Sequence, residues 1–131
     1  PDNKRNVPMS LTIRSITIDC ADPYRLARWW CSVFEVEPHP DDYPGDPAAI
    51  CSLGENVPRL LFERVPEPRS TKNRVHIDIR PDGRRDDEMA RVIGLGASLV
   101  ADHRNSDGSG WVVLADPDGN EFCIERGGAD A

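Results

Sequence analysis

The sequence predicts an α+β fold of two βαβββ modules, which form a curved eight-stranded cleft with helices on the outside. The chain has 131 residues, a length that suits one domain. Its two halves carry strand and helix signals in the same order. Matching motifs also recur at nearly constant spacing: SITID at Ser15 and HIDIR at His76 lie 61 positions apart, and LLFER at Leu60 and FCIER at Phe122 lie 62 apart. Because one such half alone leaves an open sheet, pairing the two is the expected outcome.

The first half begins with a strand. Polar and apolar residues alternate over 12–19, which is typical of a half-buried strand. Asp22 then predicts a helix N-cap and Pro23 its first turn. Apolar residues at helical spacing predict one buried face of this helix: Leu26, Trp30, Val33 and Phe34. The proline-rich stretch 38–47 is expected to end the helix, and two further strands are expected near 48–53 and 58–65.

The second half repeats this order from residue 74. Ile77 and Ile79 alternate with polar residues, which predicts a strand over 74–80. Asp82 is a plausible cap for a helix near 84–94, which glycines then end. Three more strands are expected at 98–102, 110–115 and 120–126. We therefore expect a single domain over 10–127, with modules at about 10–66 and 74–127 and with tails at 1–9 and 128–131.

Composition excludes several classes of function. Lys and Arg number 16 against 23 Asp and Glu, and the net charge of -7 repels phosphate backbones, so we expect no nucleic-acid partner. No apolar run reaches the roughly 20 residues of a membrane span, and no secretory signal is expected. The four cysteines form no CxxC pair. We expect them to be reduced thiols in a cytoplasmic protein.

Four motifs carry a resemblance to a known superfamily. They are DPYRLARWW at 22–30, NRVHID at 73–78, LGA at 95–97 and DPDGNEF at 116–122. With the duplicated βαβββ order, the chain resembles the vicinal-oxygen-chelate superfamily of glyoxalases, extradiol dioxygenases, bleomycin-resistance proteins and epimerases, and above all its small bacterial glyoxalase-like domain proteins. The resemblance implies a ligand cleft and a homodimer. It says little about the reaction, because one fold hosts many chemistries.

The resemblance also implies where metal ligands would lie. The corresponding positions here are Ser15, Leu61, His76 and Cys123. Only His76 is an ordinary ligand, and a metal site needs three or four protein ligands. We therefore expect no metal cofactor. A shift of register would offer a divalent ion a different set, made of His76, Glu63 and Glu125.

Polar residues that share strand faces are the candidate site residues. His76 and Asp78 lie two positions apart, so they share a face and could act as a proton-transfer pair. The candidate ligand contacts are Ser15, Thr17, Trp111 and Cys123. Each of these residues also has a purely structural interpretation. The polar residues could line a solvated sheet face, and His76 could bond a neighbouring strand. Trp111 could be a rim aromatic, and Cys123 a small buried hydrophobe.

Three functions compete at this point. The first is binding of a small organic molecule in a metal-free cleft, for which the acidic composition favours a cationic or aromatic guest. The alternative is a metal-dependent lyase, isomerase or dioxygenase. The third is a metal-free enzyme in which His76 and Asp78 transfer a proton.

Overall fold

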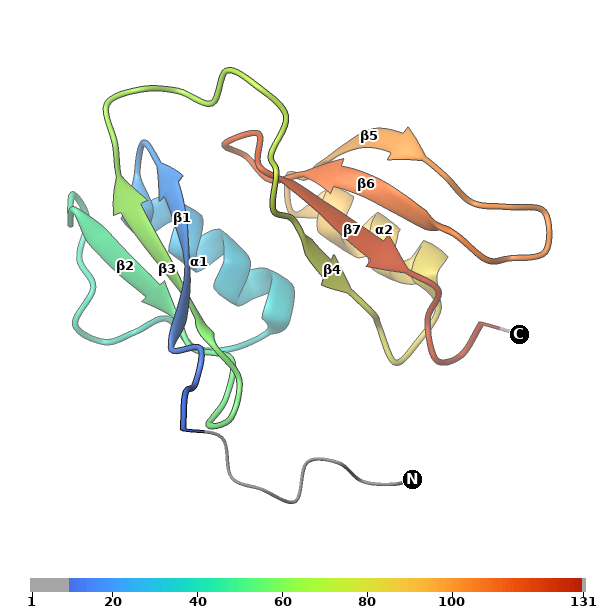
Figure 1. Cartoon of the computed structure of the whole chain (residues 1–131), viewed down its shortest axis with the longest axis horizontal. Coiled ribbons are helices and arrows are strands. Elements are labelled where there is room, and N and C mark those ends of the chain that lie inside the picture. Colours follow the sequence, from blue (N-terminus) through green and yellow to red (C-terminus); the bar gives the residue numbers. More distant parts are fainter. Residues whose placement is uncertain (1–9, 131) are drawn as a thin grey trace.

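The computed structural model describes residues 10–130, so the expected tail 1–9 lies outside the described part. It has the predicted α+β architecture, with two modules side by side (Figure 1). The first module contains β1 (Ser15–Cys20), α1 (Pro23–Phe34), β2 (Ala48–Cys51) and β3 (Arg59–Arg64). The second contains β4 (Ile77–Ile79), α2 (Arg85–Gly94), β5 (Ser98–Asp102), β6 (Trp111–Ala115) and β7 (Glu121–Glu125). Neither helix has the length and apolar character that crossing a membrane requires.

The described residues form seven strands rather than the expected eight. The second module has its four strands, whereas the first has three. The chain between α1 and β2, where a further strand could form, carries prolines at 38, 40, 44 and 47. Proline has no N–H to donate to a strand ladder, which explains why this segment stays irregular.

The predicted N-cap is confirmed for α1 and is wrong for α2. Asp22 caps α1 as predicted, since its Oδ1 accepts a hydrogen bond from the Arg25 N–H at 3.3 Å. The helix ends at Phe34, before the prolines, because Glu35 adopts a left-handed φ of 57°. The prediction of Asp82 as the cap of α2 is wrong: Arg84 occupies that position without a side-chain cap. An acidic first turn favours this helix start instead, through the helix dipole.

The two sheets place β1 and β4 at facing edges. The first sheet has the order β1-β3-β2 and the second β4-β7-β6-β5, with β1 parallel to β3 and β4 parallel to β7. The equivalent pairs Ile16–Leu60 and Ile77–Phe122 are in register, as the sequence repeat implies. In Figure 1, β1 and β4 lie on the sides of the modules that face each other. The gap between the modules is therefore bordered by two edge strands.

Two tryptophans of α1 join the modules. Trp30 is 1% exposed, and its Nε1 donates to Asp116 Oδ2 at 3.0 Å. Trp29 Nε1 donates to the Leu95 carbonyl at 2.9 Å. Both rings meet Phe122 edge-on, with centroids 6.1 and 4.9 Å away. Burial of these aromatic side chains across the boundary couples the modules into one core.

The turn after β6 is held by a buried carboxylate. Asp116 Oδ1 accepts from the N–H groups of Asp118 and Asn120, each at 2.9 Å. Its Oδ2 accepts from Asn120 Nδ2 as well as from Trp30. Burial raises the pKa of Asp116, and the hydrogen bonds oppose that shift. The predicted turn is thus also an anchor between the modules.

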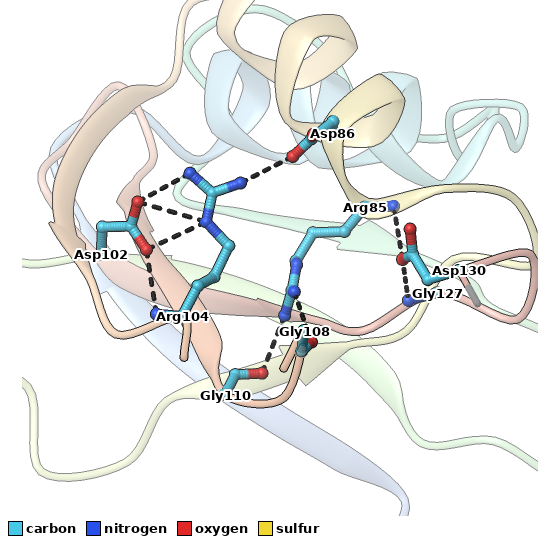
Figure 2. Close-up of polar contacts among 8 residues, drawn as sticks. All are labelled: Arg85, Asp86, Asp102, Arg104, Gly108, Gly110, Gly127 and Asp130. Atoms are coloured by element: carbon cyan, nitrogen blue, oxygen red, sulfur yellow. Dashed lines mark hydrogen bonds and ion pairs between the residues drawn. The ribbon is translucent and has the colours of Figure 1, made fainter. Parts of the chain in front are cut away.

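Two arginines hold the loop between β5 and β6 (Figure 2). The buried Arg85 guanidinium donates to the Gly108 and Gly110 carbonyls, each at 2.8 Å. Arg104 pairs with Asp86 and Asp102 at 2.7 Å. The Arg85 N–H donates to Asp130 Oδ2 at 3.0 Å. This contact attaches the end of the chain, expected as a tail, to α2.

Candidate functional site

A cavity of about 600 Å³ lies between the two modules. It is bordered by β1, by the linker between β3 and β4, and by the start of β7. We call five of its apolar lining residues the floor: Ile16, Ile18, Trp30, Ile77 and Phe122. Its volume lies in the usual range for small-molecule sites, roughly 300–1,000 Å³.

Charged side chains surround this floor. We call them the charged rim: Asp19, Glu67, Arg69, Arg74, Asp118 and Glu121. Four of the six are acidic, so the rim repeats the acidic balance of the whole chain. Asp118 Oδ2 accepts from the Ala21 N–H at 3.1 Å and so closes one end of the cavity. Glu121 is 14% exposed and lies 3.9 Å from Lys72, which partly neutralises it.

Two of the predicted site residues, Thr17 and His76, line this cavity. Ser15, Asp78, Trp111 and Cys123 are not among its lining residues. Ser15 Oγ instead accepts from Arg59 Nε at 2.9 Å. Trp111 is 45% exposed on β6 and lies against His103, with ring centroids 5.1 Å apart. Of the predicted ligand contacts, therefore, Thr17 alone lines this cavity.

His76, Asp78 and Cys123 come together beside the cavity. Asp78 and Cys123 are register partners on β4 and β7. His76 Nδ1 lies 3.4 Å from Asp78 Oδ1 and 3.8 Å from Cys123 Sγ. Burial and the nearby Asp78 carboxylate raise the pKa of Cys123 to about 11. The thiol is therefore protonated at neutral pH, which does not support a nucleophilic role.

The same three side chains fit the chemistry of a divalent metal ion. Their ligand atoms lie within 4.8 Å of one another. Among residues 10–130, this is the one group of three potential metal-ligating side chains that lie this close together. Glu63 and Glu125, the alternative ligands expected from a shifted register, are not in that group. Glu63 is instead the partner of Asp19 across β1 and β3. Nitrogen, oxygen and sulfur donors together suit Zn²⁺, with a coordination position left open.

Sequence reasoning missed the linker and the turn as parts of the cavity. Glu67, Arg69, Asn73 and Asp118 line it, although they lie outside the strands. Asn73 Oδ1 accepts from the Glu121 N–H at 3.0 Å, which fixes the linker to β7. The available signal was the NRVHID motif, where Asn73 lies four residues before the start of β4.

Comparisons with known proteins agree with this fold. The family model described as "Glyoxalase-like domain" matches residues 15–125. No curated protein matches the chain. A glyoxalase/bleomycin resistance protein/dioxygenase family enzyme from Burkholderia phytofirmans PsJN superposes with a TM-score of 0.65 at 17% identity, covering 87% of this chain and 97% of that one.

Two further solved structures show the same fold. The fosfomycin resistance protein FosX from Mesorhizobium loti gives a TM-score of 0.62 at 17% identity, covering 89% of this chain and 92% of that one. A possible glyoxalase from Bacillus cereus gives 0.64 at 14% identity, covering 88% and 99%. These identities establish the fold and leave the reaction open. On the family match over 15–125, the chain belongs to the glyoxalase-like domain family.

Proposed function

We propose that this protein binds a small organic molecule, without a metal ion, in the cavity between β1 and β4. The observation that carries the proposal is the cavity of about 600 Å³ with an apolar floor and a charged rim. Apolar walls with a few polar groups that fix orientation are typical of ligand sites. Ser15 and Leu61, at two of the positions where metal-dependent relatives are expected to carry ligands, favour the metal-free form.

The lining favours a guest with an apolar body and a cationic group. Ile16, Ile18 and Ile77 offer accessible apolar surface at the floor, whereas Trp30 and Phe122 are almost fully buried there. Asp19 and Glu67 offer carboxylates at the rim, and acidic side chains there outnumber the two arginines. A cation is also attracted by the net charge of -7. Of the predicted site residues, Thr17 and His76 carry this proposal.

A cavity-filling variant tests the proposal. We would screen cationic and aromatic compounds by thermal shift and measure the hits by isothermal titration calorimetry. Thr17→Trp places an indole in the cavity, whereas Glu63→Trp adds the same group to an exposed position outside it. Hits should bind the wild type and Glu63→Trp and lose binding to Thr17→Trp. Hits that bind all three proteins equally, or a screen without hits, would contradict the proposal.

A second candidate is a metal-dependent lyase, isomerase or dioxygenase. The grouping of His76, Asp78 and Cys123 within 4.8 Å favours it. These residues would hold the ion, which would supply Lewis-acid polarisation of a bound oxygen. Plasma mass spectrometry of protein purified without chelator, beside His76→Ala, tests this candidate. One metal ion per chain that disappears in the variant would support it and would overturn the metal-free proposal.

A metal-free enzyme is the third candidate and rests on a narrower observation. His76 lines the cavity and lies 3.4 Å from Asp78, so the pair could move a proton to or from a bound molecule. Turnover of a cavity ligand that His76→Gln abolishes while binding persists would support this role. Unchanged turnover in that variant would exclude it.

A homodimer and a cytoplasmic location also stay proposals. Leu11, Ile13 and Val75 are 70–79% exposed, and covering such side chains favours association with a second copy. Light scattering should give twice 14.6 kDa, and a value of 14.6 kDa would refute the dimer. All four cysteines are free and buried, as expected in a reducing compartment.

A further inference from the structure

The free edge of β1 faces the cavity with its backbone polar groups. β1 is the edge strand of its sheet and pairs only with β3 within the described residues. The Arg59 N–H donates to the Arg14 carbonyl at 3.1 Å, and the Val65 N–H to the Cys20 carbonyl at 2.9 Å. These two bonds bracket the parallel ladder, so even-numbered residues bond β3 and odd-numbered residues point their N–H and C=O groups away from it.

Thr17 and Asp19 are the odd-numbered residues of β1 that line the cavity. The next odd-numbered residue, Ala21, confirms the direction of this row, because its N–H donates across the gap to Asp118 Oδ2. Within residues 10–130, Thr17 and Asp19 have no such partner for their outward backbone groups. Two N–H and two C=O groups are therefore available to a ligand.

The outer edges of β2 and β5 are closed to a further strand. On β2, the outward N–H of Ile50 donates to Asp42 at 2.9 Å, and that of Ala48 donates to Asp46 at 3.2 Å. On β5, a bulge between Leu99 and Ala101 interrupts the regular ladder. Capping and bulges both prevent the addition of another strand. The edge of β1 is open along Thr17 and Asp19, and these residues line the cavity, which the edge strand β4 also borders.

We propose that the ligand of this cavity is peptide-like: a short, extended molecule whose amide groups add to β1 as a further strand. The inference rests on the proposed function and names its ligand class. At about 3.3 Å per residue, the free row from Thr17 to Asp19 spans roughly 7 Å, which an extended ligand of about three or four residues covers. Alternate ligand side chains would face Ile16 and Ile18 at the floor and Asp19 and Glu67 at the rim.

The test uses the peptide acetyl-Val-Lys-Val-Ala-amide on the full chain. Its valines suit the floor, and its lysine suits the acidic rim. In ¹H–¹⁵N spectra, binding should shift the Thr17 and Asp19 amide signals and slow their hydrogen exchange. The matched control is the same peptide with alternate amide nitrogens methylated so that they no longer donate. Equal affinity for both peptides, or unchanged exchange at Thr17 and Asp19, would overturn the inference.

A pair of variants separates backbone from side-chain recognition. Thr17→Pro removes the N–H that faces the cavity without removing a bond to β3, so the sheet should tolerate it. Thr17→Ala keeps that N–H. We expect Thr17→Pro to bind roughly three- to tenfold more weakly than Thr17→Ala, the effect of one hydrogen bond.

Other outcomes are also decisive. If Thr17→Pro fails to fold, as judged by circular dichroism, the methylated peptide on the wild type still gives the answer. If other compounds bind in a manner that Thr17→Trp blocks while the peptide does not bind, the inference fails and the proposed function stands. If nothing binds in the cavity, both fail.

Discussion

Replacing Asp116 by alanine tests how the modules are held together. The change removes the carboxylate that accepts from Trp30 Nε1, from two turn N–H groups and from Asn120 Nδ2. Trp30 is 1% exposed, so its indole N–H would stay buried without a partner. Such a group costs about 1–3 kcal/mol. The turn N–H groups lie nearer the surface, where water can replace part of what is lost.

We therefore expect Asp116→Ala to lower the free energy of unfolding by about 2–4 kcal/mol, a large share of the 5–15 kcal/mol typical of a domain. Urea denaturation followed by far-UV circular dichroism measures this loss. The matched control is Asp118→Ala, which removes one bond, to the exposed Ala21 N–H, and should cost less than about 1 kcal/mol. A loss below about 1 kcal/mol for Asp116→Ala would refute the assigned role of this carboxylate.

Three further predictions concern the second module. Arg85→Met leaves two loop carbonyls without their donor and should lower the free energy of unfolding by about 2 kcal/mol in urea; an unchanged midpoint would contradict this. The Arg104 guanidinium lowers the pKa of Asp102 from 3.8 to about 2. The ionised Asp102 carboxylate therefore stabilises the folded state fully above about pH 4, and this contribution to the free energy of unfolding is lost as the pH falls towards 2. Asp102→Asn should show a weaker acid dependence of unfolding than the wild type, and an identical one would exclude the effect. Cys123, whose pKa is about 11, should react slowly with iodoacetamide at pH 7 and faster as the pH approaches 11, and rapid labelling at pH 7 would contradict a protonated thiol.

Local signals in the sequence were sufficient for most of the fold. Asp22 and Pro23 mark the start of α1 because an N-cap acts within one helical turn. The repeated motifs identified equivalent strands in the two halves, and the structure pairs these strands alike, as Ile16–Leu60 and Ile77–Phe122. The prediction of an eighth strand was wrong because four prolines interrupt the segment between α1 and β2. The prediction of Asp82 as the N-cap of α2 was wrong because the helix begins at Arg85, and the N-cap position is set by the backbone conformation there.

The site was less predictable, since it depends on which strands become edges. Thr17 and His76 line the cavity as their strand positions suggest, because strand alternation fixes the side on which a side chain lies. Trp111 and Cys123 share strand faces with polar residues, but β6 and β7 lie inside their sheet rather than at the facing edges. The contribution of Glu67 and Arg69 depends on the path of the linker, which no periodic pattern in the sequence describes.

The most direct test of a metal-free ligand site between β1 and β4 is to locate bound ligand by ¹H–¹⁵N spectroscopy, using the strongest hit from the compound screen in the presence of chelator. We predict shifted signals within 16–21, 65–77 and 118–122, including the indole N–H of Trp30. Shifts centred on Trp111 and Cys123, or binding that disappears when chelator is added, would contradict the account.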